Sequence, residues 1–242
     1  MKISIAQIEP RKGDMEHNIK KHVLFIEKAV SNNVDMIMFP ELSLTGYEPE
    51  LANQLKTTKS DERLKRFQDL SDRHRVIICL GLPTAGDKKI FISMMIFQPG
   101  KDCTVYSKQY LYPTETGIFT AGNNPLIIHF DKEHIIAPAI CYELSNEEHH
   151  KNAKDKGATI YMASVLNSIN GVDADIEKLS RIAAKYKMTT FMSNYVGQSG
   201  GYECAGKSSI WNDKGELIAQ LGDKTEGLLI YDTETGKAKT EY

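Results

Sequence analysis

Residues 35–47 read DMIMFPELSLTGY, a short apolar run that is closed by a proline and followed at once by a glutamate. Such a run is typical of a strand that is buried on both faces, because both faces then carry apolar side chains. The strand would deliver the loop after it to one edge of a sheet. The sequence therefore predicts a buried strand over residues 35–39, with Glu41 at its carboxyl end.

The segments around this strand carry strand and helix signatures. Residues 3–7 alternate as a strand does, and residues 15–31 repeat apolar side chains at helical spacing. Residues 61–72 resemble a charged surface helix. Further strands are predicted at 76–82, 90–97, 104–107, 126–130 and 134–139, separated by glycine, proline and polar turns.

The second half of the chain returns to an alternation of strands and helices. The pattern predicts a polar helix at 146–156, a strand at 159–163, a helix at 174–187, a strand at 190–194 and terminal strands near Ser208, Leu217 and Leu228. Helices towards both ends and hairpins in the middle favour a layered α/β (α+β) protein with mixed sheets, because helices are available to cover one face of each sheet.

Composition points to one cytoplasmic domain. A chain of 242 residues with 41% hydrophobic side chains is expected to form a single domain over residues 1–242. Its 30 basic and 32 acidic side chains give a net charge of −2, which provides no field to gather nucleic acid or an anionic membrane. The opening MKISIAQIEP lacks the apolar core of a secretory signal, and no run could span a bilayer. Four widely spaced cysteines fit a reduced compartment.

Three reactive side chains stand where apolar strands give way to loops, namely Glu41 in MFPELSLTGY, Lys108 in VYSKQYLYPTE and Cys141 in IAPAICYEL. Amide hydrolysis needs a nucleophile, a base that takes its proton, and a donor aimed at the oxygen that becomes negative. Cysteine, glutamate and lysine can supply these roles without a histidine. We also expect the cationic Lys108 to stabilise the Cys141 thiolate.

The three segments together resemble the nitrilase, or carbon-nitrogen hydrolase, superfamily, whose members carry a Glu-Lys-Cys triad in this order. The first block matches residues 39–47, and the third matches Ile140 to Glu143. The second block is matched by Tyr106, Lys108, Leu111, Glu115, Phe119 and Gly122. Landmarks elsewhere extend the resemblance over essentially the whole chain.

The resemblance implies a role for each matched residue. Glu41 would be the general base, Cys141 the nucleophile and Lys108 the stabiliser of the oxyanion. Glu115 would orient Lys108, and the backbone N–H of Tyr142 would form part of the oxyanion hole. Tyr47 and Glu143 are assigned to the substrate or oxyanion site, with a plain salt bridge left open for Glu143.

The resemblance also implies a four-layer αββα sandwich, a homodimer, and no metal or organic cofactor. The substrate would be a small-molecule amide or carbamoyl compound, and Tyr142 after the nucleophile favours amides over nitriles. Tyr110 stands where family members commonly carry histidine, the usual proline-acid pair after the nucleophile is replaced by residues 145–148, and Trp211-Asn212-Asp213 lacks a proline. These departures leave the specific substrate undetermined.

Several alternatives stay open at this stage. The chain could be an N-carbamoyl or ureido hydrolase of the same mechanism, a non-catalytic binding module, or an acyltransferase on the same fold. Cys141 alone would more often be a structural thiol, which is how we interpret Cys79, Cys103 and Cys204. His149 and His150 lack the spacing for a shared metal, so they are expected on a solvated helix face. Glycines 197, 200 and 201 predict a turn that could border the pocket.

Overall fold

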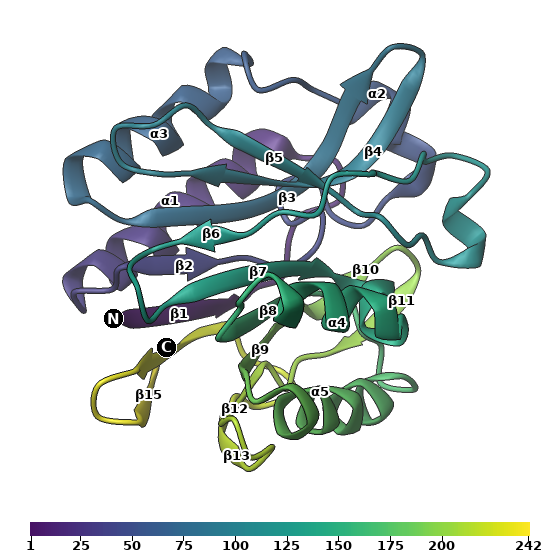
Figure 1. Ribbon diagram of the computed structural model, residues 1–242. Coiled ribbons are helices and arrows are strands. Elements are labelled where there is room, and N and C mark those ends of the chain that lie inside the picture. The colour runs from purple at the N-terminus through teal and green to yellow at the C-terminus, as the bar shows by residue number, and fades with distance from the viewer.

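The computed structural model describes residues 1–242 and contains two β-sheets packed face to face, with helices on the outer face of each (Figure 1). The first sheet has the strand order β15-β14-β1-β2-β3-β4-β5. Its strands are β1 (Lys2–Gln7), β2 (Met36–Met38), β3 (Ile77–Gly86), β4 (Lys89–Phe97), β5 (Thr104–Ser107), β14 (Gly227–Asp232) and β15 (Lys237–Glu241). β1, β2 and β3 run parallel, and the other pairings are antiparallel.

The second sheet has the strand order β13-β12-β9-β8-β7-β6, in which β7, β8 and β9 run parallel. Its strands are β6 (Ile128–His129), β7 (Ile135–Ile140), β8 (Ile160–Ser164), β9 (Thr189–Ser193), β12 (Ser209–Trp211) and β13 (Leu217–Gln220). A separate hairpin is formed by β10 (Val196–Ser199) and β11 (Tyr202–Ala205). Each sheet therefore has a parallel centre, whose strands share one carboxyl edge.

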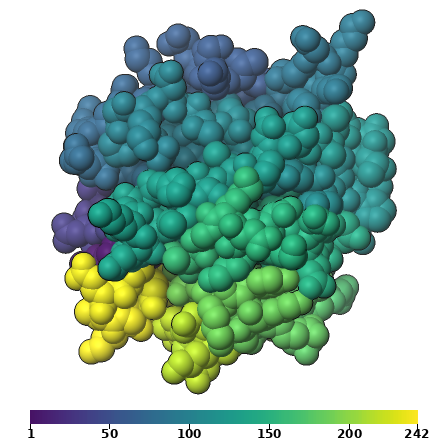
Figure 2. Space-filling view, viewed as in Figure 1, coloured from purple at the N-terminus to yellow at the C-terminus, as the bar shows by residue number.

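Helices α1 (Met15–Ser31) and α3 (Lys65–His74) cover the outer face of the first sheet, and α4 (Glu147–Asp155) and α5 (Val172–Tyr186) cover that of the second. The short α2 (Ala52–Leu55) lies outside these layers. In Figure 2 the blue surface of the residues around α3 and the green surface of the residues around α5 lie on different sides of the molecule, with teal residues between them. The four-layer αββα sandwich with mixed sheets is confirmed.

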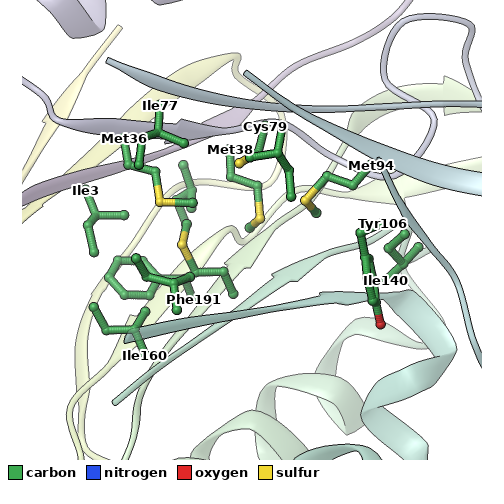
Figure 3. Packing of buried hydrophobic residues seen from close by; sticks show 14 of the residues in the cluster. Ile3, Met36, Met38, Ile77, Cys79, Met94, Tyr106, Ile140, Ile160 and Phe191 are labelled. Atoms are coloured by element: carbon green, nitrogen blue, oxygen red, sulfur yellow. The ribbon is translucent and has the colours of Figure 1, made fainter. Parts of the chain in front are cut away.

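The two sheets meet through one apolar core that joins residues far apart in the chain. Met36 and Met38 point into it, whereas the intervening Ile37 packs against the helices, as the two-residue period of a strand requires. Figure 3 shows side chains of the first sheet, such as Met38, facing Ile160 and Phe191 of the second. This packing brings the carboxyl ends of β2 and β7 to the same end of the molecule.

Several details differ from the prediction. The helix expected from residue 61 begins at Lys65, because Asp61 caps a preceding 3-10 turn. The short α2, the β10–β11 hairpin and β15 were not predicted. β15 reads KAKTE and is mostly exposed, so it lacks the apolar pattern that marks a strand. None of the helices has the length and apolar character needed to cross a bilayer.

Candidate active site

The three reactive side chains come from the two facing sheets. Glu41 follows β2 and Lys108 follows β5, both in the first sheet, whereas Cys141 follows β7 in the second. Glu41 and Lys108 therefore approach Cys141 across the inter-sheet core. The sequence predicted the strand ends correctly but not that two sheets share the site.

The Lys108 ammonium lies between two carboxylates. Its Nζ donates to Glu41 Oε1 at 2.7 Å and to Glu115 Oε1 at 2.8 Å, and its side chain has no exposed surface. Burial lowers the pKa of Lys108, but the negative charges around it, first of all Glu41, outweigh that effect and hold the pKa above its usual value. Lys108 is therefore a cation, and two of its three N–H donors are engaged.

Glu115 ends a 3-10 turn (Pro113–Glu115) and is itself held by several donors. Tyr47 donates its hydroxyl to Glu115 Oε1 at 2.7 Å, and the backbone N–H of Tyr112 donates to Oε2 at 2.7 Å. With Lys108, these donors satisfy both oxygens of a buried carboxylate. Glu115 and Glu41 thus hold the Lys108 ammonium together.

Glu41 has one engaged and one free oxygen. Oε1 accepts from Lys108, whereas the buried Oε2 has no hydrogen-bond partner in the protein. Burial raises the pKa of Glu41 to about 7, because the favourable charge of Lys108 only partly offsets desolvation and Glu115 adds a like charge. A buried carboxylate with a free oxygen and a pKa near neutrality has the properties of a general base.

The close approach of β3 fixes the loop that carries Glu41. A Cβ atom at Gly81 would lie 2.3 Å from the backbone nitrogen of Leu42, so only glycine leaves room for this loop. Leu44 also donates its N–H to the Gly81 carbonyl at 3.0 Å. Gly122 plays the same part beside Lys108, because a Cβ atom there would lie 2.3 Å from the Ser107 carbonyl oxygen, and its N–H donates to the Lys108 carbonyl at 2.8 Å.

Cys141 lies at a sharp turn between β7 and a 3-10 turn (Cys141–Ser145). Its backbone φ is 43°, a conformation that non-glycine residues rarely adopt and that is often found at functional sites. Its thiol lies 3.8 Å from the Leu166 carbonyl oxygen. The turn places the side chain in the cavity described below.

Lys108 acts on the Cys141 thiol in the expected direction, since it lowers the thiol pKa, but burial and Glu41 oppose it. Burial raises the pKa of the Cys141 thiol well above its usual range, and the negative charge of Glu41 raises it further. Lys108 acts in the opposite direction but does not compensate. A thiol with a raised pKa that acts as a nucleophile has to lose its proton during attack, which calls for a neighbouring base.

A cavity of about 320 Å³ contains this group of side chains. Five of the predicted site residues line it, namely Glu41, Tyr47, Glu115, Cys141 and Tyr142. The fully buried Lys108 lies behind Glu41 and Glu115. The remaining walls come from Tyr112, Ser145, Leu166, Asn167, Ser168, Gly171, Ala174, Asp175, Lys178 and Tyr202. Most of these wall residues lie on loops and on α5, where no sequence motif marks them.

Glu143, two residues after Cys141, is buried and does not line the cavity. It accepts from the Ile140 N–H at 2.7 Å, from the Gln109 N–H at 2.6 Å and from the Tyr106 hydroxyl at 2.8 Å. Ile140 precedes Cys141 and Gln109 follows Lys108, so this carboxylate joins the two strand ends. Burial raises the pKa of Glu143 to about 7, against the effect of these donors.

The expectation of solvated histidines is wrong. His149 and His150 are both buried, because the face of α4 that carries them packs against Tyr161 of β8. The His149 ring bonds to the Tyr106 hydroxyl through Nε2 and to the Tyr161 hydroxyl through Nδ1, each at 2.8 Å. Desolvation lowers the pKa of His149 to about 4, so the ring is neutral. It supports the Tyr106 hydroxyl that donates to Glu143.

The glycine turn expected near the pocket connects β10 to β11 and packs against a cavity residue. A Cβ atom at Gly200 would lie 2.6 Å from the Tyr47 carbonyl oxygen. Ser199, on the same turn, accepts from the Tyr47 N–H at 2.9 Å. Tyr202, the second residue after Gly200, reaches the cavity wall.

The αββα sandwich carries a buried carboxylate, ammonium and thiol at one end, which is an arrangement suited to a hydrolase with a cysteine nucleophile. Comparison with known proteins identifies the family. A sequence model of the carbon-nitrogen hydrolase family matches residues 2–239. The chain belongs to this family, and the resemblance to the nitrilase superfamily is confirmed.

Curated relatives include nitrilases and amidases. A probable nitrilase from Schizosaccharomyces pombe is 25% identical, over 99% of this chain and 91% of the relative. A 2-oxoglutaramate amidase from Bacillus subtilis is 27% identical, over 94% of this chain and 88% of the relative. This chain is thus a carbon-nitrogen hydrolase by family, with relatives that differ in their named substrates.

Solved structures with the same fold include an amidase from Nesterenkonia sp. AN1. It aligns with a TM-score of 0.88 and 22% identity, over 96% of this chain and 92% of the amidase, in a form with acrylamide added at the active-site cysteine. A cysteine-to-alanine mutant of that amidase in complex with butyramide also aligns with a TM-score of 0.88 and 22% identity, over 98% of this chain and 92% of the amidase. At this identity the likeness establishes the shared fold.

Proposed function

We propose that the protein is an amidase that converts a small amide to a carboxylic acid and ammonia through a thioester on Cys141. The observation that carries the proposal is the free, buried Glu41 Oε2 in the cavity that also holds the Cys141 thiol. A neutral thiol and an unpartnered carboxylate oxygen form a nucleophile and base pair that needs no histidine.

In the first half-reaction, Cys141 Sγ attacks the amide carbon while Glu41 Oε2 takes the thiol proton. The carbonyl oxygen becomes an oxyanion, which the third N–H of Lys108 and the backbone N–H of Tyr142 stabilise. The tetrahedral intermediate then breaks its carbon–nitrogen bond. Glu41 returns the proton to the leaving nitrogen, so ammonia departs and the acyl group stays on sulfur.

In the second half-reaction, water attacks the thioester carbon and gives a proton to Glu41. The carbon–sulfur bond breaks, and the thiolate that leaves recovers a proton from Glu41. The products are a carboxylic acid and the original thiol. The same steps would cleave an N-carbamoyl compound, so the acyl part of the substrate has to be determined by experiment.

The test is ammonia release from a panel of primary amides, N-carbamoyl compounds and nitriles, with the wild type beside Cys141→Ala. We expect release from at least one amide by the wild type and none by the variant. Cys204→Ala is a matched control, because this buried thiol does not line the cavity. Release that persists in Cys141→Ala would refute the assignment.

The homodimer that the resemblance implies and the cytoplasmic location that the composition indicates stay predictions. Light scattering coupled to size-exclusion chromatography tests the first directly. A mass of about 27 kDa for the folded chain, the mass of one copy, would contradict it.

A further inference from the structure

One wall of the cavity carries an ion pair that the proposed reaction does not use. Asp175 and Lys178 both line the cavity from α5, and Lys178 Nζ lies 2.8 Å from Asp175 Oδ1. The same Nζ donates to Ser145 Oγ at 2.9 Å. Ser145 ends the turn that begins at Cys141, so this ion pair is anchored to the nucleophile's own segment.

Asp175 keeps one carboxylate oxygen free. Oδ1 accepts from Lys178, whereas Oδ2 accepts no hydrogen bond from the protein. The Asp175 side chain is 14% exposed and that of Lys178 is 34% exposed, so the carboxylate is the more enclosed partner. A partly buried carboxylate with an unused acceptor favours a ligand that brings a donor, and a charged donor most of all.

The charges around the cavity favour a cationic ligand. Glu41, Glu115 and Asp175 face only two ammonium groups, those of Lys108 and Lys178, which leaves one negative charge in excess when all are ionised. An anionic substrate would add to this excess, whereas an ammonium group would neutralise it. The difference in electrostatic energy between the two substrates is larger in a partly desolvated cavity than in water.

Aromatic rings add to the same preference. Four tyrosines line the cavity, namely Tyr47, Tyr112, Tyr142 and Tyr202, and the last three are also exposed. The rings of Tyr112 and Tyr142 pack edge to face with centroids 5.2 Å apart. Tyrosine faces attract ammonium groups, and combinations of such rings with a carboxylate are a common means of binding them.

We propose that the cavity selects amides whose acyl part carries an ammonium group, with Asp175 Oδ2 as the acceptor for that group. Lys178 and Ser145 hold the Asp175 carboxylate in place, and the tyrosines line the entry. This inference rests on the proposed amidase function, because it names the substrate class of the same site.

A bound ammonium group would also assist the nucleophile. The negative charge of Asp175 contributes to the raised pKa of the Cys141 thiol, although less than burial and Glu41 do. A substrate cation beside Asp175 cancels that contribution. Asp175 therefore opposes ionisation of the thiol in the empty site but no longer does so when the proposed substrate is bound.

The experiment compares kcat/KM for amides that differ only by an ammonium or a methyl end: β-alaninamide against butyramide, and ε-aminocaproamide against heptanamide. Succinamic acid supplies the anionic comparison. We expect at least one ammonium amide to exceed its neutral partner by about tenfold, as a partly desolvated ion pair would give, and succinamic acid to be the poorest substrate. In Asp175→Asn this ratio should fall to near unity.

Asp173→Asn is the matched control, because Asp173 lies on the same helix, is 80% exposed and pairs with Lys207 away from the cavity. This variant should keep the wild-type ratio. Neutral amides that equal or exceed both ammonium amides in the wild type would overturn the proposal. So would an ammonium preference that survives in Asp175→Asn.

A second measurement needs neither turnover nor a variant. Cys141 is modified with aminoethyl, methyl and sulfonatoethyl methanethiosulfonate, and each rate is divided by the rate of the same reagent with a free small thiol. These normalised rates should decrease in that order. Equal normalised rates would contradict a cation-selective cavity. If no amide is hydrolysed but the order holds, the amidase proposal fails while the charge preference of the cavity stands. If amides are hydrolysed without the preference, only the inference about substrate class fails.

Discussion

Lys108 Nζ donates to Glu41 Oε1 at 2.7 Å, and neither side chain has any exposed surface. This contact determines which oxygen of Glu41 is available, because Oε1 is occupied and Oε2 is left without a partner. In the proposed reaction Lys108 thus orients the base, Glu41, as well as supplying a positive charge. Its replacement should therefore affect both stability and catalysis.

Lys108→Met removes the cation between two buried carboxylates. Breaking a buried ion pair in this way typically costs about 3–5 kcal/mol in the free energy of unfolding, because a buried charge is left uncompensated. Urea denaturation of the wild type and the variant at neutral pH measures the loss. Lys185→Met is the matched control, since the Lys185–Glu147 pair is exposed and should contribute little. Equal stabilities for Lys108→Met and the wild type would contradict the buried network.

The pH dependence of kcat/KM should report Glu41. The base has to be ionised to accept the thiol proton, and burial raises the pKa of Glu41 to about 7. As pH falls below that value the protonated fraction grows, so kcat/KM should decrease by about tenfold per pH unit. The residual activity of Glu41→Gln should lack this acidic limb. A wild-type profile that stays flat down to pH 5, about two units below, would exclude Glu41 as the base.

Gly81→Ala tests the close approach of β3 to the loop that carries Glu41. The new Cβ would lie 2.3 Å from the Leu42 nitrogen, so the backbone on one side has to move. We expect a loss of about 1–3 kcal/mol in stability, typical of overpacking, together with lower kcat. Gly117→Ala is the control, because nothing lies within 4 Å of its added Cβ. Thermal unfolding and initial rates measure both variants, and equal effects at the two positions would refute the steric argument.

Glu143→Gln tests the link between the strand ends of Lys108 and Cys141. A glutamine amide nitrogen cannot accept a hydrogen bond, so the N–H of either Ile140 or Gln109 loses its acceptor. The buried unpaired donor should cost about 1–3 kcal/mol of stability. If Glu143 positions the nucleophile, kcat should fall while KM changes little, because the residue does not line the cavity. A change in KM alone would instead indicate contact with substrate.

The sequence predicted the parts of the site that occupy strand ends. Glu41 and Cys141 each follow a buried apolar strand, a pattern that can be seen in a single sequence, whereas Lys108 follows the partly exposed strand β5. The resemblance to the family added Glu115, whose contact with Lys108 no local pattern could have indicated. Long-range contacts of this kind depend on how the sheets pack and not on neighbouring residues.

The features that could not be predicted depend on tertiary context. Asp175 and Lys178 have the spacing of an ordinary surface pair on a helix, and only the packing of α5 beside the cavity gives them a further role. His149 looked solvated because its helix is rich in charge, but that helix packs against β8. Tyr110, which replaces a common family histidine, packs edge-on against His149 and does not line the catalytic cavity.

The most direct test of the central claim is to mix the protein rapidly with an amide that it hydrolyses, quench the mixture in acid and measure the intact mass of the protein. We predict a mass increase equal to the acyl group, located by peptide mapping on Cys141 and absent in Cys141→Ala. The adduct should disappear as the amide is consumed, since water releases it. The thioester mechanism would be contradicted by steady ammonia release from the wild type with no adduct at Cys141 at any time. It would also be contradicted if the adduct lay on Cys79, Cys103 or Cys204 instead.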